Sequence, residues 1–172
     1  MSQAWGEMDQ QLVDYVRARW PALVRYAAVV CGDASEGEEL AQATLVRVAA
    51  RWRLLRDRDN IDAYVRTAIV RAHINRRTRL RRRETPVAEL PATPSIDPTE
   101  GAGRGVDIRR ALATLPPRQR AVLVLRYLDD LSELQTADVL GCSVGTVKSQ
   151  ASKALASLRA SFPELSDEAV TQ

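Results

Sequence analysis

The segment from Ser132 to Arg159 restricts the possible folds of this chain most strongly, because it contains two helical patterns joined by a tight turn. Ser132 and Gln135 have the spacing of a capping box at the start of the first helix, and Gly141 is placed to end that helix. Ser143 can cap the second helix. The apolar positions of the second helix recur at steps of three and four and are Val144, Val147, Ala151, Leu155 and Leu158. The segment is therefore predicted to form a helix-turn-helix.

The opposite face of the second helix is small, polar and cationic. Its side chains are Thr146, Lys148, Ser149, Gln150, Ser152 and Lys153. Residues 144–159 include no Asp or Glu, whereas a solvated surface helix usually carries carboxylates as well as amines. An ordinary helical hairpin with a solvated face is the alternative interpretation. A helix that lies in a DNA major groove needs an apolar back and compact donors, so we expect these six side chains to contact DNA.

A second basic region precedes the middle of the chain. The formal net charge of the 172 residues is only +3, yet residues 71–83 contain seven arginines and His73 without any acidic residue. A nucleic-acid surface, a contact with an anionic membrane and a solvated helix end all fit such a run. A membrane helix needs a large apolar face, and only Leu80 is apolar in residues 76–83, so nucleic acid is favoured. The candidates are Arg71, Asn75, Arg76, Arg77 and Arg79.

A change of composition divides the chain into two parts. Residues 85–105 are rich in Pro and Gly and are predicted to form a flexible linker. The linker separates an N-terminal helical module, residues 1–84, from a C-terminal module, residues 106–162, which contains the helix-turn-helix. A short acidic tail, residues 163–172, follows. The fold class is therefore predicted to be all-α, as two small helical modules.

Four helices are predicted in the N-terminal module. The first covers residues 8–19, and the second opens at Pro21, since proline is well tolerated at a first helical position. The third extends from the capping residue Asp33 to about Arg53, and residues 54–62 form a loop before the fourth. The polar side of the third helix is either a solvated surface or a contact surface and consists of Glu38, Glu39, Gln42 and Arg47.

Other classes of function lack the residues that they need. Cys31 and Cys142 lie in separate helical patterns with a single His in the chain, so no zinc site, disulfide or cofactor is predicted. The carboxylates are scattered, and no nucleophile is paired with a base, so no catalytic site is predicted. We recognise no signal peptide, and no apolar run approaches the roughly 18 residues of a membrane span. We therefore expect a cytoplasmic protein without membrane insertion.

Three segments resemble one family, the extracytoplasmic-function sigma factors of bacterial RNA polymerase. LPPRQRAVLVLRYLDDLS followed by ADVLGCSVGTVKSQ is similar to the domain that reads the promoter −35 element. EELAQATLVRV resembles the segment that docks on the clamp helices of the largest polymerase subunit, although Ala43 and Leu45 stand where the family often has Glu and Phe. The helix from Tyr64 through the arginines resembles the element that reads the −10 region.

The resemblance implies roles for these residues. Docking on polymerase falls to Glu38, Glu39, Gln42 and Arg47, and Asn60 with Tyr64 would capture a displaced −10 base, although Tyr64 is equally compatible with a core position. The implied partners are core RNA polymerase and promoter DNA, with an anti-sigma factor as a further candidate. The implied function is to bind core polymerase and to direct promoter recognition and transcription initiation.

Two alternatives to a sigma factor are a stand-alone helix-turn-helix regulator, which binds its site without polymerase, and an enzyme that acts on DNA. The regulator leaves the N-terminal arginines without a role, and the enzyme lacks a catalytic site. The linker suits a sigma factor, because it averages about 25 Å from end to end and can extend to roughly 70 Å, about two turns of DNA.

Overall fold

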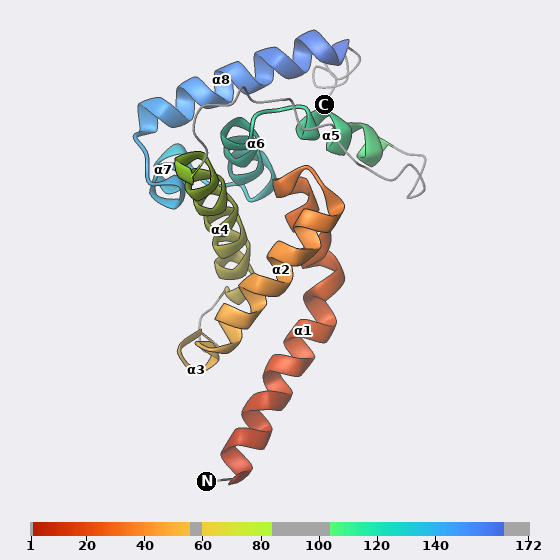
Figure 1. Ribbon diagram of the computed structural model, residues 1–172, viewed down its shortest axis with the longest axis vertical. Helices are drawn as coiled ribbons and strands as arrows, with labels where there is room; N and C mark the ends of the chain where they lie inside the picture. Colours follow the sequence, from red (N-terminus) through yellow and green to blue (C-terminus); the bar gives the residue numbers. More distant parts are fainter. Residues whose placement is uncertain (1, 56–59, 84–103, 164–172) are drawn as a thin grey trace.

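The computed structural model describes residues 2–55, 60–83 and 104–163, and these residues contain helices and no strand (Figure 1). The α-helices are α1 (Ser2–Cys31), α2 (Ala34–Ala49), α3 (Trp52–Leu55), α4 (Ile61–Arg83), α5 (Arg104–Ala113), α6 (Pro117–Leu123), α7 (Glu133–Leu140) and α8 (Val144–Ser161), with a π-helical segment, η1 (Val124–Leu128), after α6. The predicted all-α class is confirmed. In the described part of the chain, no helix has the length and apolar character needed to cross a membrane.

The N-terminal module is a bundle of α1, α2 and α4. Asp33 caps α2 by accepting a hydrogen bond from the backbone N–H of Glu36 at 2.8 Å. Gly37 is buried where α2 meets α1, and a Cβ at this position would lie 2.4 Å from the backbone nitrogen of Ala28. The absence of a side chain therefore allows the two backbones to approach closely. The core of the bundle includes Leu23, Val30, Leu40, Leu45, Val65 and Ile69.

Two predicted helix boundaries in this module are wrong. Residues 8–19 and the helix expected from Pro21 belong to one continuous helix, α1, with Pro21 inside it. The side chains that follow the proline, Leu23 and Tyr26, are buried, and their burial offsets the hydrogen bond that a proline removes from a helix. The third predicted helix ends at Ala49, and Trp52 begins the separate helix α3, so the expected loop is partly helical. Residues 56–59 lie outside the described residues.

The helix-turn-helix forms with the predicted caps. Ser132 Oγ accepts a hydrogen bond from the Gln135 backbone N–H at 3.2 Å, and Gln135 Oε1 accepts one from the Ser132 N–H at 2.8 Å. Gly141 ends α7 with φ of +61°, in the left-handed region where glycine has no steric cost. Ser143 Oγ accepts from the Thr146 N–H at 3.1 Å and so starts α8.

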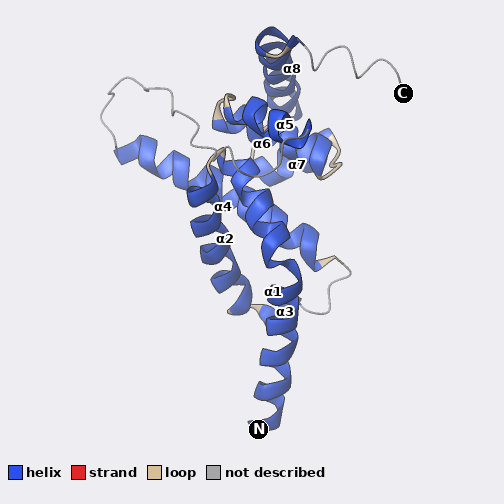
Figure 2. Cartoon of the chain, turned by 90° about the vertical axis from the view of Figure 1, so that its right-hand side faces the viewer, coloured by secondary structure: helices blue, strands red, loops and turns tan. Residues whose placement is uncertain are grey.

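The C-terminal module sits against one end of the bundle (Figures 1 and 2). Ala121, Val124 and Leu125 of α6 and η1 extend the core of the N-terminal module. Asp129, which follows η1, accepts hydrogen bonds from Tyr26 Oη at 2.5 Å and Arg66 Nη1 at 3.2 Å. In this structure the two modules therefore share a core and a polar contact.

The segments expected to be linker and tail can be compared with the structure only at their edges. Residues 84–103 and 164–172 lie outside the described residues, and α5 begins at Arg104, two residues before the predicted start of the C-terminal module. Differences of this size are ordinary at helix ends.

Candidate nucleic-acid and polymerase interfaces

The exposed face of α8 carries four of its six candidate side chains together. Lys148, Ser149, Ser152 and Lys153 are exposed, and Val147 is fully buried on the opposite side of the helix. Lys148 Nζ lies 3.6 Å from Glu133 Oε2 of α7, and both side chains face solvent. An exposed pair of this kind contributes little and is easily exchanged for a phosphate. The face is therefore open to an anionic ligand.

The two remaining candidates on α8 lie closer to the turn or the core. Thr146 is half-buried, and its hydroxyl lies 2.9 Å from Ser143 Oγ as part of the cap. Gln150 is half-buried as well. Neither side chain is as free to reach a base edge as the four exposed donors are.

The arginines of α4 are held by other parts of the protein. Arg77 Nη2 lies 3.2 Å from Glu36 Oε2, and Arg76 Nη1 lies 3.8 Å from Glu39 Oε2. Arg71 Nε donates to the backbone carbonyl of Val139 in α7 at 3.3 Å. These contacts orient the guanidinium groups, and the contact of Arg71 involves the C-terminal module.

A groove between α2 and α4 brings together candidates from two predicted surfaces. One hollow of about 490 Å³ is lined in part by Glu39, Arg47, Asn75, Arg76 and Arg79. A neighbouring hollow of about 200 Å³ shares Arg47 and Asn75 and is lined as well by Arg51, Tyr64, Thr67 and Arg71. Five arginines and one carboxylate make this groove cationic, and Tyr64 adds an aromatic ring. Cationic grooves with aromatic side chains are suited to single-stranded nucleic acid.

Sequence reasoning missed Arg51 and Thr67, which also line this groove. Arg51 lies four residues after Arg47, which is a spacing that places side chains on one helix face. That signal was available, but Arg51 falls in the turn between α2 and α3, where the helical pattern ends. Thr67 carries no charge and had no signal of its own.

Asn60 and Tyr64 differ in their surroundings. The side chain of Asn60 caps α4, since its Oδ1 accepts a hydrogen bond from the Ala63 N–H at 3.0 Å. Tyr64 is half-buried, and it both packs against the core of the bundle and lines the smaller hollow. The structure therefore gives Tyr64 a contact with the core and access to the groove.

The side chains expected to dock on polymerase are divided between two places. Glu38 and Gln42 are exposed one turn apart on α2. Glu39 and Arg47 are also exposed, but they line the groove toward α4. Only Glu38 and Gln42 thus lie outside the groove.

His73 lies among the arginines of α4 in the sequence, but it is not part of their basic surface. Its side chain is fully buried, and its Nδ1 lies 3.5 Å from Cys31 Sγ at the end of α1. Burial and the nearby charges of Arg120, Arg77 and Arg76 lower the pKa of His73 to about 4. The imidazole is therefore neutral at physiological pH.

Comparisons with known proteins identify both modules. Residues 10–83 match the family described as Sigma-70 region 2, and residues 105–158 match Sigma-70, region 4. The chain is 40% identical over 150 residues to the RNA polymerase sigma-E factor of Streptomyces coelicolor, which covers 85% of this chain and 82% of that protein. It is 30% identical over 156 residues to the ECF RNA polymerase sigma factor EcfG of Rhodopseudomonas palustris, covering 89% of this chain and 86% of that one.

A solved structure has a similar fold. The sigma factor RpoE of Bartonella quintana, in complex with the anti-sigma factor NepR, superimposes with a TM-score of 0.60 and 25% identity over 87% of this chain and 95% of that chain. The family matches cover both modules in their order along the chain, and the relatives match most of its length. The chain belongs to the extracytoplasmic-function sigma factors, which direct transcription initiation by RNA polymerase.

Proposed function

We propose that the two modules of this sigma factor divide promoter recognition between them, with the N-terminal module docking on core polymerase and reading the −10 element and α8 reading the −35 element. The observation that carries the proposal is the presence of one cationic face in each module, the α2/α4 groove and the exposed face of α8. The protein acts in the cytoplasm, where its polymerase is, and has no catalytic activity of its own.

The α8 face is suited to duplex DNA. Lysine can donate to guanine O6 and N7, and serine can pair with several base edges. The apolar back of α8, with Val147 and Ala154 fully buried, holds the helix on its scaffold. We assign contacts with −35 bases and flanking phosphates to Lys148, Ser149, Ser152 and Lys153.

The α2/α4 groove is suited to a displaced strand. Arg47, Arg51, Arg71, Arg76 and Arg79 can hold the backbone, and an unpaired base can stack on Tyr64, a contact of about 1 to 3 kcal/mol. Asn60 lies one turn before Tyr64 at the start of α4 and completes the assigned surface, with Asn75 and Arg77 on the same helix.

The packed arrangement of the modules supports a requirement for polymerase. The linker can extend to roughly 70 Å, about two turns of duplex, so that the modules can reach separate promoter elements, whereas here α4 and α7 touch and Arg71 donates to the carbonyl of Val139. The modules must separate before both elements can be read. Free protein should therefore bind promoter DNA weakly at physiological salt, and purified core polymerase should give promoter-dependent transcription. Tight, specific binding in a gel shift without polymerase would favour the stand-alone regulator instead.

The docking surface can be tested without disturbing the groove. Changing Glu38→Lys together with Gln42→Ala alters two exposed side chains that take no part in the ion pairs to α4. The double variant should retain the helical circular dichroism of the wild type and lose most of its polymerase in a pull-down. Ser35→Lys, an exposed position in the first turn of the same helix, is the matched control. Equal recovery of polymerase by all three proteins would reject the docking assignment.

An anti-sigma factor is the third partner that we propose. A cleft of about 550 Å³ spans both modules and is lined by apolar side chains that include the exposed Ile108, Tyr127 and Leu128. Exposed apolar clefts of this kind accept an amphipathic helix. The RpoE structure that this chain resembles was solved with an anti-sigma factor bound, which supports a partner of this class. Leu128→Asp should abolish repression by such a factor and leave polymerase-dependent transcription unchanged.

A further inference from the structure

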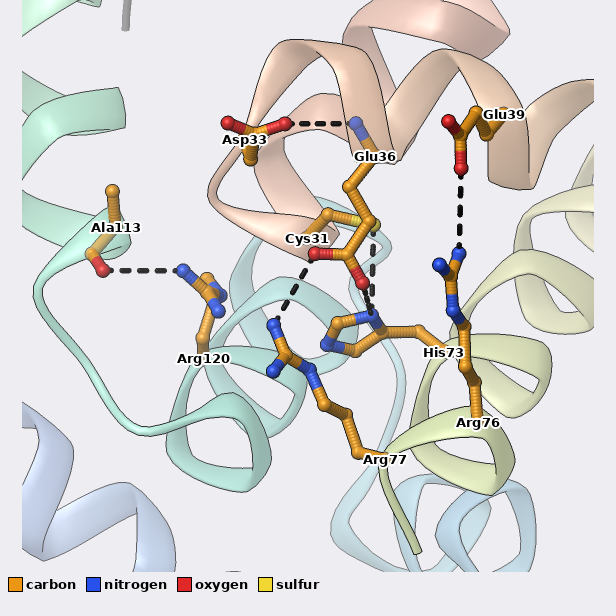
Figure 3. A network of polar contacts seen from close by, with 9 residues as sticks. All are labelled: Cys31, Asp33, Glu36, Glu39, His73, Arg76, Arg77, Ala113 and Arg120. Atoms are coloured by element: carbon orange, nitrogen blue, oxygen red, sulfur yellow. Dashed lines mark hydrogen bonds and ion pairs between the residues drawn. The ribbon is translucent and has the colours of Figure 1, made fainter. Parts of the chain in front are cut away.

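Three potential metal ligands from three helices meet inside the N-terminal module. Cys31 ends α1, Glu36 lies in the first turn of α2, and His73 lies in the middle of α4. Cys31 Sγ is 3.5 Å from His73 Nδ1, which is 3.9 Å from Glu36 Oε1, and one ligand atom from each residue lies within 4.8 Å of the others. The three side chains point toward one another (Figure 3).

Two of the distances between ligand atoms can be compared with those around a tetrahedral zinc ion. Zinc bonds of about 2.3 Å to sulfur and about 2.0 to 2.1 Å to nitrogen and oxygen place neighbouring ligand atoms roughly 3.6 Å apart for S and N and roughly 3.4 Å apart for N and O. The Sγ to Nδ1 distance of 3.5 Å matches the first value. The Nδ1 to Oε1 distance of 3.9 Å exceeds the second by about 0.5 Å, and a rotation of the Glu36 carboxylate can close that difference.

The protonation and surroundings of the ligands are compatible with a metal. The neutral imidazole of His73 is the form that binds zinc, and its Nδ1 is the ring nitrogen that faces Cys31 Sγ and Glu36 Oε1. Glu36 presents Oε1 to the cluster while its Oε2 is held by Arg77 at 3.2 Å, as carboxylate ligands in metal sites usually are. Burial raises the pKa of Cys31 to about 12, so the metal would replace the thiol proton, which is released to solvent.

Three arginines, Arg76, Arg77 and Arg120, act on the cluster and oppose a cation there, and Arg120 is the one that comes from the other module. Arg120 of α6 is only 4% exposed and donates from Nη1 to the carbonyl of Ala113 at 3.2 Å. Its guanidinium lies against Gly32, where even a single Cβ would overlap it. Its positive charge is close enough to Cys31 and His73 to influence both. A dication at the cluster would be repelled by this guanidinium.

We propose that Cys31, Glu36 and His73 form a zinc site in the N-terminal module, and that zinc competes with the docking of Arg120 and hence with the packed arrangement of the two modules. Zinc would tie α1, α2 and α4 together while the C-terminal module moves away. The site is independent of the assignment of promoter contacts, because none of its three ligands lies in the α2/α4 groove or on the exposed face of α8.

Cobalt(II) is the probe for the site, since tetrahedral Co²⁺ with a thiolate ligand gives strong visible bands and a charge-transfer band in the near ultraviolet. Metal-free, untagged full-length protein should bind one equivalent of Co²⁺ with both features, and Zn²⁺ should displace it. Cys31→Ser should lose the charge-transfer band and His73→Gln the tetrahedral spectrum. Cys142→Ser is the matched control, because Cys142 lies in the helix-turn-helix and should not affect either. No tetrahedral spectrum in the wild type, or a thiolate band that requires Cys142, would overturn the proposal.

The competition with Arg120 has its own test. Arg120→Met removes the charge and keeps the bulk, and it should tighten Co²⁺ binding on the order of tenfold or more. Arg118→Met, an exposed arginine of the same helix, should leave the affinity unchanged. Equal affinity in both variants would reject the competition. If a ligand variant does not fold, alkylation of the wild-type protein during partial unfolding tests the site. Zn²⁺ should slow the alkylation of Cys31 and not that of Cys142. Equal rates of Cys31 alkylation with and without Zn²⁺ would reject the site.

Discussion

The two basic helices of this protein differ in what their cations contact. On α4, Arg76 and Arg77 pair with carboxylates of α2, and Arg71 donates to a backbone carbonyl of α7. On α8, Lys148 has one loose, exposed partner, and no ion pair of Lys153 occurs among the residues that the structure describes. The cations of α4 are therefore oriented by carboxylates of α2 and by the C-terminal module, whereas the face of α8 is open.

This difference suits two kinds of DNA contact. Duplex DNA presents a regular groove, so a rigid helix with free donors can read it without preparation. A displaced strand is flexible, and arginines fixed by neighbouring carboxylates are already arranged along the path of its backbone, which reduces the entropy lost on binding. We therefore expect α8 to tolerate opening of the modules with little change and α4 to depend on it.

The largest expected effect tests whether the two modules share one core. Leu125 belongs to the C-terminal module by sequence, but it is fully buried in the core of the bundle. Leu125→Ala should lower the free energy of unfolding by about 2 to 5 kcal/mol. All three tryptophans of the chain precede the linker, so tryptophan fluorescence during urea denaturation reports only the N-terminal module.

Leu128→Ala, in the same π-helical segment at a residue that is 55% exposed, is the matched control and should change the stability by less than about 0.5 kcal/mol. A tryptophan-monitored midpoint that does not move in Leu125→Ala would show that the modules unfold independently.

The next effect concerns the polar contact of Asp129 with Tyr26 of α1 and Arg66 of α4, which joins the two modules. Asp129→Ala leaves the hydroxyl of Tyr26, a residue that is only 5% exposed, without its acceptor, and it should weaken module docking by about 1 to 3 kcal/mol. Small-angle scattering should record a larger radius of gyration, and single-stranded −10 DNA should bind more tightly as Arg71 is released. Asp138→Ala removes the same charge from an exposed position on α7 and should do neither. If the radius of gyration increases but single-stranded −10 DNA binds no more tightly, Arg71 is not part of the −10 surface.

The open face of α8 should respond differently at its two lysines. Replacing a lysine that reads a base by alanine should cost on the order of 1 to 3 kcal/mol of binding free energy. It should also relax the sequence preference at one −35 position. A lysine that binds phosphate should weaken all promoters alike and lower the salt slope by about one. Transcription from a library with every −35 position varied distinguishes the two for Lys148→Ala and Lys153→Ala, with Ser157→Ala as the exposed control. If both lysine variants keep the wild-type preference throughout, neither lysine reads a base.

The smallest effect comes from releasing a single arginine of α4. Glu39→Gln removes the partner of Arg76, and because both side chains are exposed the change in affinity for single-stranded DNA should stay below about 1 kcal/mol. Glu38→Gln makes the same charge change at an exposed neighbouring position outside the groove. Titrations of both variants with single-stranded DNA at two salt concentrations compare their affinities. A gain in the affinity of Glu39→Gln much above this limit would mean that the carboxylates of α2 block the groove instead of organising it.

Local features of the fold could be predicted from the sequence because short-range chemistry determines them. The capping box at Ser132, the left-handed Gly141 and the cap at Ser143 each involve residues within three or four positions. The continuous α1 could not be predicted, since Pro21 is locally a helix start and only the burial of Leu23 and Tyr26 overrides that preference. Tertiary packing outweighs a local propensity of this size.

The arrangement of the sites depends on contacts between distant residues, for which no periodicity gives a signal. Tyr26 and Asp129 are separated by 103 positions, and Cys31 and His73 by 42. The spacing rules that exclude a metal site apply to ligands close in sequence, whereas these ligands are brought together by helix packing. The α2/α4 groove has the same origin, because it joins side chains from two helices that the sequence assigned to different partners.

The insertion of Ala121, Val124 and Leu125 into the bundle has a consequence for how the protein meets polymerase. If the C-terminal module moves toward the −35 element, as we propose, these three side chains and the apolar surface beneath them lose their cover together. An N-terminal fragment cut in the linker would present the same bare surface and should be prone to self-association. On this proposal, polymerase must cover the exposed apolar surface of the two separated modules as well as hold them in place, so each module exchanges its contact with the other module for a contact with polymerase.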